Sequence, residues 1–286
     1  MHEIIHIIKH TVIDSLPLLP FLFLTYLLME FIEHKTSEKS KSAISKAGVF
    51  GPVAGGLLGI IPQCGFSAAA SSLYSGRIIS LGTLFAIFLS TSDEMLPIFL
   101  SNKVEISVIL KILGVKAAIG IVLGFLVDLA FRLLKKPQKE VEVHSLCEHD
   151  HCHCEESIFK SSLIHTVKIF AFIFVINLAL NFVIEFIGED RLSSLFTNTP
   201  VVGSALSALV GLIPNCAASV VITELYLSGV ISMGAMLAGV LTGSGMGLLL
   251  LFRTNKNLRE NLVILVTLYL FGFLTGSIFE LIGITF

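Results

Sequence analysis

The chain has 286 residues, of which 54% are hydrophobic and only 14% are charged, and its formal net charge is -2. A soluble domain carries about 25% charged residues, so this composition excludes an ordinary water-soluble protein. The near-neutral charge offers no basic surface to a nucleic acid, and 5 cysteines without a secretory pattern exclude a disulfide scaffold. The chain is therefore predicted to be an all-α polytopic membrane protein.

Six long apolar segments are predicted to cross the membrane, because a membrane helix needs about 20 mostly apolar residues. In chain order they are 11–31, 78–100, 104–134, 164–187, 231–252 and 262–284. Two further apolar tracts, 47–75 and 201–227, are each interrupted near the middle, at Ile61-Pro-Gln-Cys64 and at Ile213-Pro-Asn-Cys216. The pieces beside each interruption are too short to span the bilayer comfortably. They are predicted to be broken helices, short tilted spans or re-entrant hairpins, which protein or a water-filled cavity must shield from lipid.

The chain contains an internal duplication. The motif Ile61-Pro-Gln-Cys64-x-x-Ser67 recurs as Ile213-Pro-Asn-Cys216-x-x-Ser219, at an offset of 152 residues. The same offset pairs Gly59 with Gly211, Leu73-Tyr74 with Leu225-Tyr226, Ser80 with Ser232, Gly82 with Gly234, and Ser90 and Ser92 with Thr242 and Ser244. Chance does not give such an ordered series, so residues 1–134 and 160–286 are predicted to be two membrane repeats joined by a linker at 135–159.

Equivalent loops of the two repeats carry opposite charge bias, and lysine and arginine in short loops mark the cytoplasmic side. Loop 34–46 holds four lysines, whereas its counterpart 188–199 holds one arginine beside two acids. The repeats are therefore predicted to be inverted in a plasma or inner membrane, with both termini outside and the linker in the cytoplasm. Each repeat then has three spans plus a hairpin, or five spans. The chain accordingly has eight long or short apolar segments, two of which are hairpins, or ten segments.

The two interruptions are predicted to form a midplane site, because paired broken segments of inverted repeats carry the substrate site in secondary transporters. Proline breaks each helix, Gln63 and Asn215 supply amide oxygens, and Cys64 and Cys216 supply soft sulfur. The hydroxyls that accompany them are those of Ser67, Ser219, Ser90, Ser92, Thr242 and Ser244. The alternative is that each cysteine packs as a small hydrophobe and that the amides cap the broken ends.

Three of the carboxyls within apolar tracts are candidates for coupling, because ionisable groups are costly there and usually bind cations or relay protons. Asp93 and Glu94 follow the hydroxyls of the first repeat, whereas the equivalent stretch 242–246 has no acid. Glu224 is predicted to be the buried acid of the second repeat. The three are predicted to couple transport to protons or cations, and the alternative places Asp93 and Glu94 near the outer interface.

The cytoplasmic linker has the composition of a metal-binding segment, with three thiols and four imidazoles between residues 144 and 156. The candidate ligands are His144, Cys147, His149, Asp150, His151, Cys152, His153 and Cys154. Their spacing matches no closed zinc finger, so a flexible tract that senses or delivers a metal ion is predicted. The alternative is a polar linker without a role in metal binding.

Four features of the sequence together resemble a known family. They are the duplicated Pro-[Gln/Asn]-Cys-x-x-Ser segments, the Leu-Tyr and Ser-x-Gly after each, the Ser-x-Ser-Asp-Glu stretch and the His/Cys-rich loop. It is the family of ten-transmembrane heavy-metal exporters, whose members carry names such as arsenic efflux or manganese transport protein. The resemblance covers nearly the whole chain. It implies metal or metalloid efflux and a topology in which each interrupted tract counts as two segments.

The favoured function is a secondary-active exporter of a heavy-metal ion, a transition-metal ion or a metalloid, and not an enzyme. The chain lacks Gly-x-x-x-x-Gly-Lys-[Ser/Thr], so an ion gradient or a partner would supply energy. The expected partners are the lipid bilayer and the transported or chelated metal, with no nucleic acid and no cofactor, and a homo-oligomer is compatible. Two other hypotheses stay open: an intramembrane thiol oxidoreductase that uses Cys64 and Cys216, and a channel or carrier for a small organic solute.

Overall fold

The computed structural model describes residues 48–61, 64–92, 95–133, 158–187 and 200–284, together with isolated positions between 9 and 27. The described residues form helices and no strands. Four helical segments among them are long and apolar enough to cross a membrane, by length and composition: Leu81–Ser101, Ile106–Leu133, Met233–Thr254 and Leu258–Ile282. The all-helical architecture is therefore that of a polytopic membrane protein.

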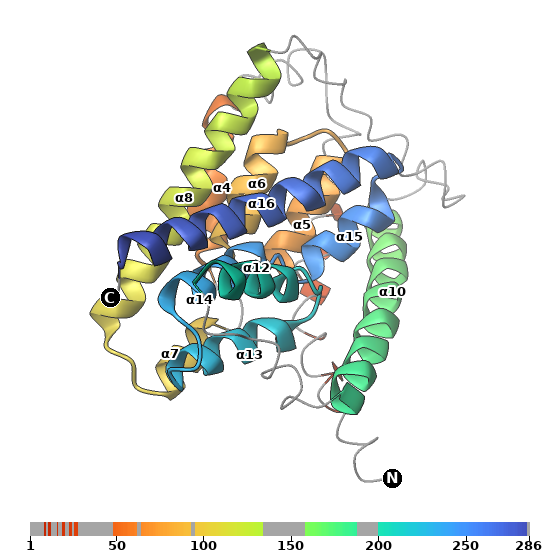
Figure 1. Ribbon diagram of the computed structural model, residues 1–286. Coiled ribbons are helices and arrows are strands. Elements are labelled where there is room, and N and C mark those ends of the chain that lie inside the picture. The colour runs from red at the N-terminus through yellow and green to blue at the C-terminus, as the bar shows by residue number, and fades with distance from the viewer. Residues whose placement is uncertain are drawn as a thin grey trace.

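The helices occur as one series that appears twice along the chain (Figure 1). The first series is η1 (Gly48–Phe50), α4 (Gly51–Gly59), α5 (Cys64–Ser75), α6 (Leu81–Ser90), α7 (Met95–Ser101) and α8 (Ile106–Leu133). The helix α10 (Ile158–Ile187) follows, on the opposite side of the molecule from α8 (Figure 1). The second series is α12 (Pro200–Gly211), α13 (Cys216–Leu227), α14 (Met233–Thr242), α15 (Met246–Thr254) and α16 (Leu258–Ile282).

The starts of α6 and α14 show how closely the two series correspond. Ser80 and Ser232 cap these helices, and each hydroxyl accepts a hydrogen bond from a first-turn amide at 3.1 Å. Ser80 also donates to Asp128 Oδ2 at 2.7 Å, in the last turns of α8. Ser232 likewise donates to Glu280 Oε2, in the last turns of α16. The duplication therefore extends to a carboxylate at the end of each long helix.

Glycines allow α6 to approach α8, and α14 to approach α16, at backbone distance. A Cβ atom at Gly82 would collide with the carbonyl of Gly124, and one at Gly124 with the carbonyl of Gly82. Gly234 and Gly276 face each other in the same way. Because small residues let membrane helices pack closely, these positions determine which helices pair in each half.

Two segments that were predicted to be continuous spans are broken. Segment 78–100 contains α6 and α7, which are separated after Ser90, and segment 231–252 contains α14 and α15, which are separated at Gly243–Gly245. The hydroxyls of Ser90 and Thr91 donate back to carbonyls of α6, both at 2.7 Å, and so occupy acceptors near its end. Gly245 has φ of 51°, a left-handed conformation that favours glycine.

The two halves interlock through two apolar clusters. One cluster joins α5 and α6 of the first half to α15 and α16 of the second, and includes Phe85 and Leu268. The other joins α7 and α8 of the first half to α13 and α14 of the second, and includes Met95 and Ile222. Each cluster therefore contains helices of both halves, so neither half has a core of its own among the described helices.

Candidate functional site

The predicted interruptions are observed, and in each half they lie against the end of the broken span. Gly59, the last residue of α4, contacts Ser90, the last residue of α6, so closely that a Cβ would collide with the Ser90 hydroxyl. Gly211, the last residue of α12, contacts Thr242 at the end of α14 in the same way. The Pro-containing break and the second break of each half therefore lie side by side.

The two halves meet at these breaks. Ser67, in the first turn of α5, is fully buried, and a Cβ atom at Gly247 in the first turn of α15 would lie 2.8 Å from the Ser67 Cβ. One turn later, Ser71 donates to the Gly247 carbonyl at 2.6 Å. Ser219 of α13 lies beside Gly243, where a Cβ would be 3.2 Å from its hydroxyl oxygen. Serines from both halves thus border the break between α14 and α15.

Lys116 connects the broken span of the first half to that of the second. It lies within α8 with no exposed surface, and its Nζ donates to the carbonyls of Thr91, just beyond α6, and Val240, near the end of α14, the latter at 3.2 Å. Lys116 is not among the site residues predicted from the sequence. A signal was present, because a cationic side chain reaches the interface easily only from the end of a membrane helix, and Lys116 is far from both ends.

Most of the polar residues predicted for the site are buried. They are Ser67, Ser90, Ser92, Asn215, Thr242 and Ser244, with Ser219 half-buried. Several of their hydroxyls bind nearby main-chain carbonyls: Ser92 donates to Ser90 at 3.1 Å, and Thr242 donates to Ala208 at 2.9 Å. The prediction that these residues gather around the breaks fits their positions at the helix ends, and their role in binding a substrate stays a prediction.

The prediction of a buried Glu224 is wrong. α13 buries Val221, Ile222 and Leu225 against the protein, and Glu224 lies on its other side with an exposed side chain. Because neighbouring positions on a helix point in different directions, an apolar tract alone does not place an acid inside the protein. A role in cation coupling at this position stays a prediction.

The remaining predicted ligands lie outside the described residues. They are Gln63, Asp93, Glu94 and the linker residues His144, Cys147, His149, Asp150, His151, Cys152, His153 and Cys154. Cys64 and Cys216 are the first residues of α5 and α13, but their side chains are likewise outside the described set. Within the part of the chain that the structure describes, no three His, Cys, Asp or Glu side chains group to hold a metal ion.

A polar network joins the end of α5 to the second half. Glu260, in the first turn of α16, accepts hydrogen bonds from Arg77 Nη1 at 2.6 Å, from Arg77 Nη2 at 3.0 Å and from the Tyr74 hydroxyl. Ser75 and Thr254 share a hydrogen bond of 2.7 Å beside it. The hydrogen bond to Glu260 raises the pKa of Arg77, so the guanidinium keeps its positive charge.

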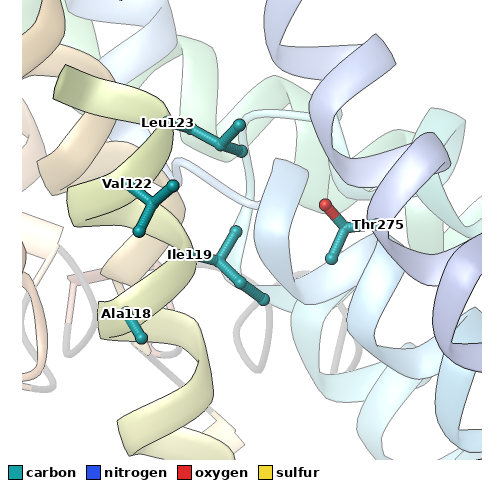
Figure 2. A pocket seen from close by; sticks show the side chains of 5 residues that line it. All are labelled: Ala118, Ile119, Val122, Leu123 and Thr275. Carbon is teal, nitrogen blue, oxygen red and sulfur yellow. The ribbon is translucent and has the colours of Figure 1, made fainter. Parts of the chain in front are cut away.

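A surface recess lies between α8 and α16 (Figure 2). Ile119 and Leu123 point from α8 toward Thr275 on α16, and Ala118 and Val122 complete the lining. Apart from the Thr275 hydroxyl the lining is apolar, so it offers an ion no set of ligands. The buried polar side chains of Ser67, Ser90 and Thr242 lie at the helix breaks instead.

The fold and the breaks define a helical membrane protein with two pairs of interrupted helices that meet in its interior. A model of the family described as "Putative, 10TM heavy-metal exporter" matches residues 5–186 and again residues 129–269. These two regions together cover most of the chain, which therefore belongs to this family, and the resemblance inferred from the motifs is confirmed. No curated protein and no solved structure matches the chain.

Proposed function

We propose that the chain is a secondary-active exporter that binds a heavy-metal ion, a transition-metal ion or a metalloid where the broken helices of its two halves meet. The observation that carries this proposal is that broken helices of the two halves are in contact, as α5 and α15 are, in a chain that belongs to the exporter family. Broken helices expose unpaired backbone groups and helix-end dipoles inside the membrane, which is how many transporters bind ions.

The directions of the long helices support inverted repeats. Asp128, in the last turns of α8, binds Ser80, and Arg77, three residues before Ser80, binds Glu260 at the start of α16. We call this end of the molecule the Arg77 face. Because α8 ends and α16 begins at the Arg77 face, these equivalent helices run in opposite senses (Figure 1). Opposite senses are what an inverted duplication requires.

The contacts of α4 and α5 support a re-entrant hairpin. Along α4, Gly51 contacts Thr83 near the start of α6 and Gly59 contacts Ser90 at its end, so α4 runs from the Arg77 face toward the breaks. α5 then returns, because Ser75 at its end binds Thr254 beside the start of α16. With α12 and α13 as the equivalent hairpin, each half has three spans and one hairpin, which the family description counts as five segments.

The distribution of basic residues supports a cytoplasmic Arg77 face. The basic residues of the described loops and helix ends at this face are Arg77, Arg132, Arg253, Lys256 and Arg259. The loop between α7 and α8 at the other face holds Lys103 and Glu105. The linker that follows α8 then lies in the cytoplasm, where its histidines and cysteines could collect the metal before export, and the C-terminus lies outside.

The test is metal transport by the purified protein in liposomes, with a panel of soft and borderline metal ions and metalloids. Cys64→Ser and Cys216→Ser are expected to abolish transport of the preferred ion, because serine oxygen binds soft ions weakly. Ser107→Ala, at an exposed residue of α8 outside the breaks and the linker, is the control and should leave the maximal rate unchanged. Full transport by both Cys64→Ser and Cys216→Ser would overturn the thiolate site, and no transport of any panel member would overturn the proposed substrate class.

A further inference from the structure

We propose that Lys116 is a resident cation: its ammonium occupies a cation-binding position formed by the carbonyl ends of α6 and α14, one from each half. The position itself follows from contacts in the protein, and its part in export rests on the proposed function. Nothing in the family description or in the motifs assigns a role to this residue.

The two carbonyls that Lys116 binds have no amide donor from a following helical turn, because both helices end there. α6 ends at Ser90, and the Thr91 carbonyl lies just beyond it. α14 ends at Thr242, and the amide of Ser244, which would reach Val240 in a continued helix, binds the Thr242 carbonyl instead at 2.8 Å. The last carbonyls of a helix lack partners and carry the negative end of its dipole. Two such ends that converge on one point form a site for a positive charge.

Comparison of the two halves shows that packing alone does not require a lysine at this position. The equivalent residue of α16 is Leu268, which is also fully buried and belongs to an apolar cluster. A leucine therefore fills the same place in the duplicated helix pair α14–α16. Burial of an ammonium is expensive in a protein interior and more so in a membrane. The two carbonyls of Thr91 and Val240 contribute to compensating that cost for the lysine of α8.

A fixed positive charge at this position links the binding of a transported cation to the relative movement of the α6 and α14 ends. Lys116 holds a carbonyl of each half, so separation of the α6 and α14 ends would break one of its hydrogen bonds. A transported cation that enters the breaks is repelled by this charge, strongly because the surroundings are of low dielectric constant. We therefore assign Lys116 as a positioning residue, whose side chain a metal ion displaces when it binds.

The first experiment asks whether the position accepts a free cation once the lysine is removed. Full-length Lys116→Ala is purified in detergent, and its Tm is measured against NH4+, K+ and Na+ at constant ionic strength, with N-methylglucamine as the bulky replacement. The variant should unfold several degrees below the wild type and regain most of the loss saturably with a small cation, because a ligand of the folded state alone stabilises it. The wild type should not respond.

Two variants keep this test decisive. Lys111→Ala removes an exposed lysine of the same helix and should behave as the wild type. Lys116→Met fills the space without a charge and should lower the Tm without rescue by any cation. If Lys116→Ala does not fold, Lys116→Ser replaces it. An equal response of Lys116→Ala and wild type to every cation, or rescue of Lys116→Met, overturns the proposal.

Transport measurements separate this proposal from the proposed function. Lys116→Ala should transport metal with an altered KM and a new dependence on the small cation that stabilises it, whereas Lys111→Ala should not. Cation rescue of the variant without any metal transport by the wild type would support the resident cation and overturn the proposed exporter. Metal transport by the wild type without cation rescue of the variant would support the exporter and overturn the resident cation.

Discussion

Neutralising Glu260 is predicted to weaken the contact between the two halves at the Arg77 face. Its carboxylate accepts two hydrogen bonds from the Arg77 guanidinium, at 2.6 Å and 3.0 Å, and a third from the Tyr74 hydroxyl. Glu260→Gln keeps the shape but removes the charge, and it turns one acceptor into a donor that faces the guanidinium. One hydrogen bond of the pair is therefore lost, and the charge of Arg77 is left without its partner in this network.

The magnitude follows from the burial of the pair. The side chains of Arg77 and Glu260 are 13% and 21% exposed. Exposed ion pairs contribute about 0–1 kcal/mol, and breaking a fully buried pair costs about 3–5 kcal/mol. This pair lies between these limits and has bidentate geometry, so Glu260→Gln is expected to lower the free energy of unfolding by about 2 kcal/mol. For a chain of this size the Tm should fall by about 5 °C.

The assay is a double-mutant cycle on the purified protein in detergent, with Arg77→Ala, Glu260→Ala and the double variant. Thermal or denaturant unfolding should give a coupling free energy of about 1–2 kcal/mol. The exposed neighbour Arg259→Ala serves as the control and should change stability by less than about 0.5 kcal/mol. A coupling near zero, or an equal loss from Arg259→Ala, would refute the assignment of this ion pair as a contact that stabilises the two halves.

Three further perturbations test the packing of the halves by thermal unfolding or hydrogen exchange. Gly124→Leu should destabilise by about 3 kcal/mol or more because its Cβ would collide with α6, whereas Gly114→Leu on the same helix, with no atom within 4 Å of its Cβ position, should be nearly neutral. Ser80→Ala and Ser232→Ala should each cost about 1 kcal/mol, and clearly unequal losses would argue against equivalent caps. Ser71→Ala removes the hydrogen bond between α5 and α15, so amides of both helices should exchange faster while those of α10 stay unchanged.

The duplicated architecture could be predicted from the sequence because residues that recur at a fixed offset have the same structural role in both halves. The 152-residue offset pairs Ser80 with Ser232. In the structure each of them caps a helix and donates to a carboxylate in the last turns of a long helix. Asp128 and Glu280 obey the same 152-residue offset, so this pair of carboxylates was predictable from the sequence as well. The boundaries of the repeats at 134 and 160 and the metal-binding linker stay predictions.

The missed features depend on information that a sequence window does not hold. No proline marks the end of α6, and the break there follows from the hydroxyl run Ser90–Ser92, whose side chains compete for backbone carbonyls. Lys116 is one of two lysines within α8, and the two carbonyls to which it donates are 25 and 124 residues away in the chain. Glu224 was misplaced because the buried side of α13 is decided by α14 and α7, not by the tract that contains it.

The differences between the halves, more than their likeness, decide which state an exporter of the proposed kind occupies at rest. In an inverted duplication the two halves exchange conformations during transport, so identical halves would favour neither state. At the Arg77 face, α5 and the second half are held by an ion pair and hydroxyl bonds. The equivalent contact of α13 and α7 is apolar, with the rings of Phe99 and Tyr226 6.3 Å apart. Opening the Arg77 face therefore requires breaking charged contacts that have no counterpart among the described residues of the α7–α13 contact, and the substrate of the proposed exporter can drive that step only by its difference in affinity for the two states.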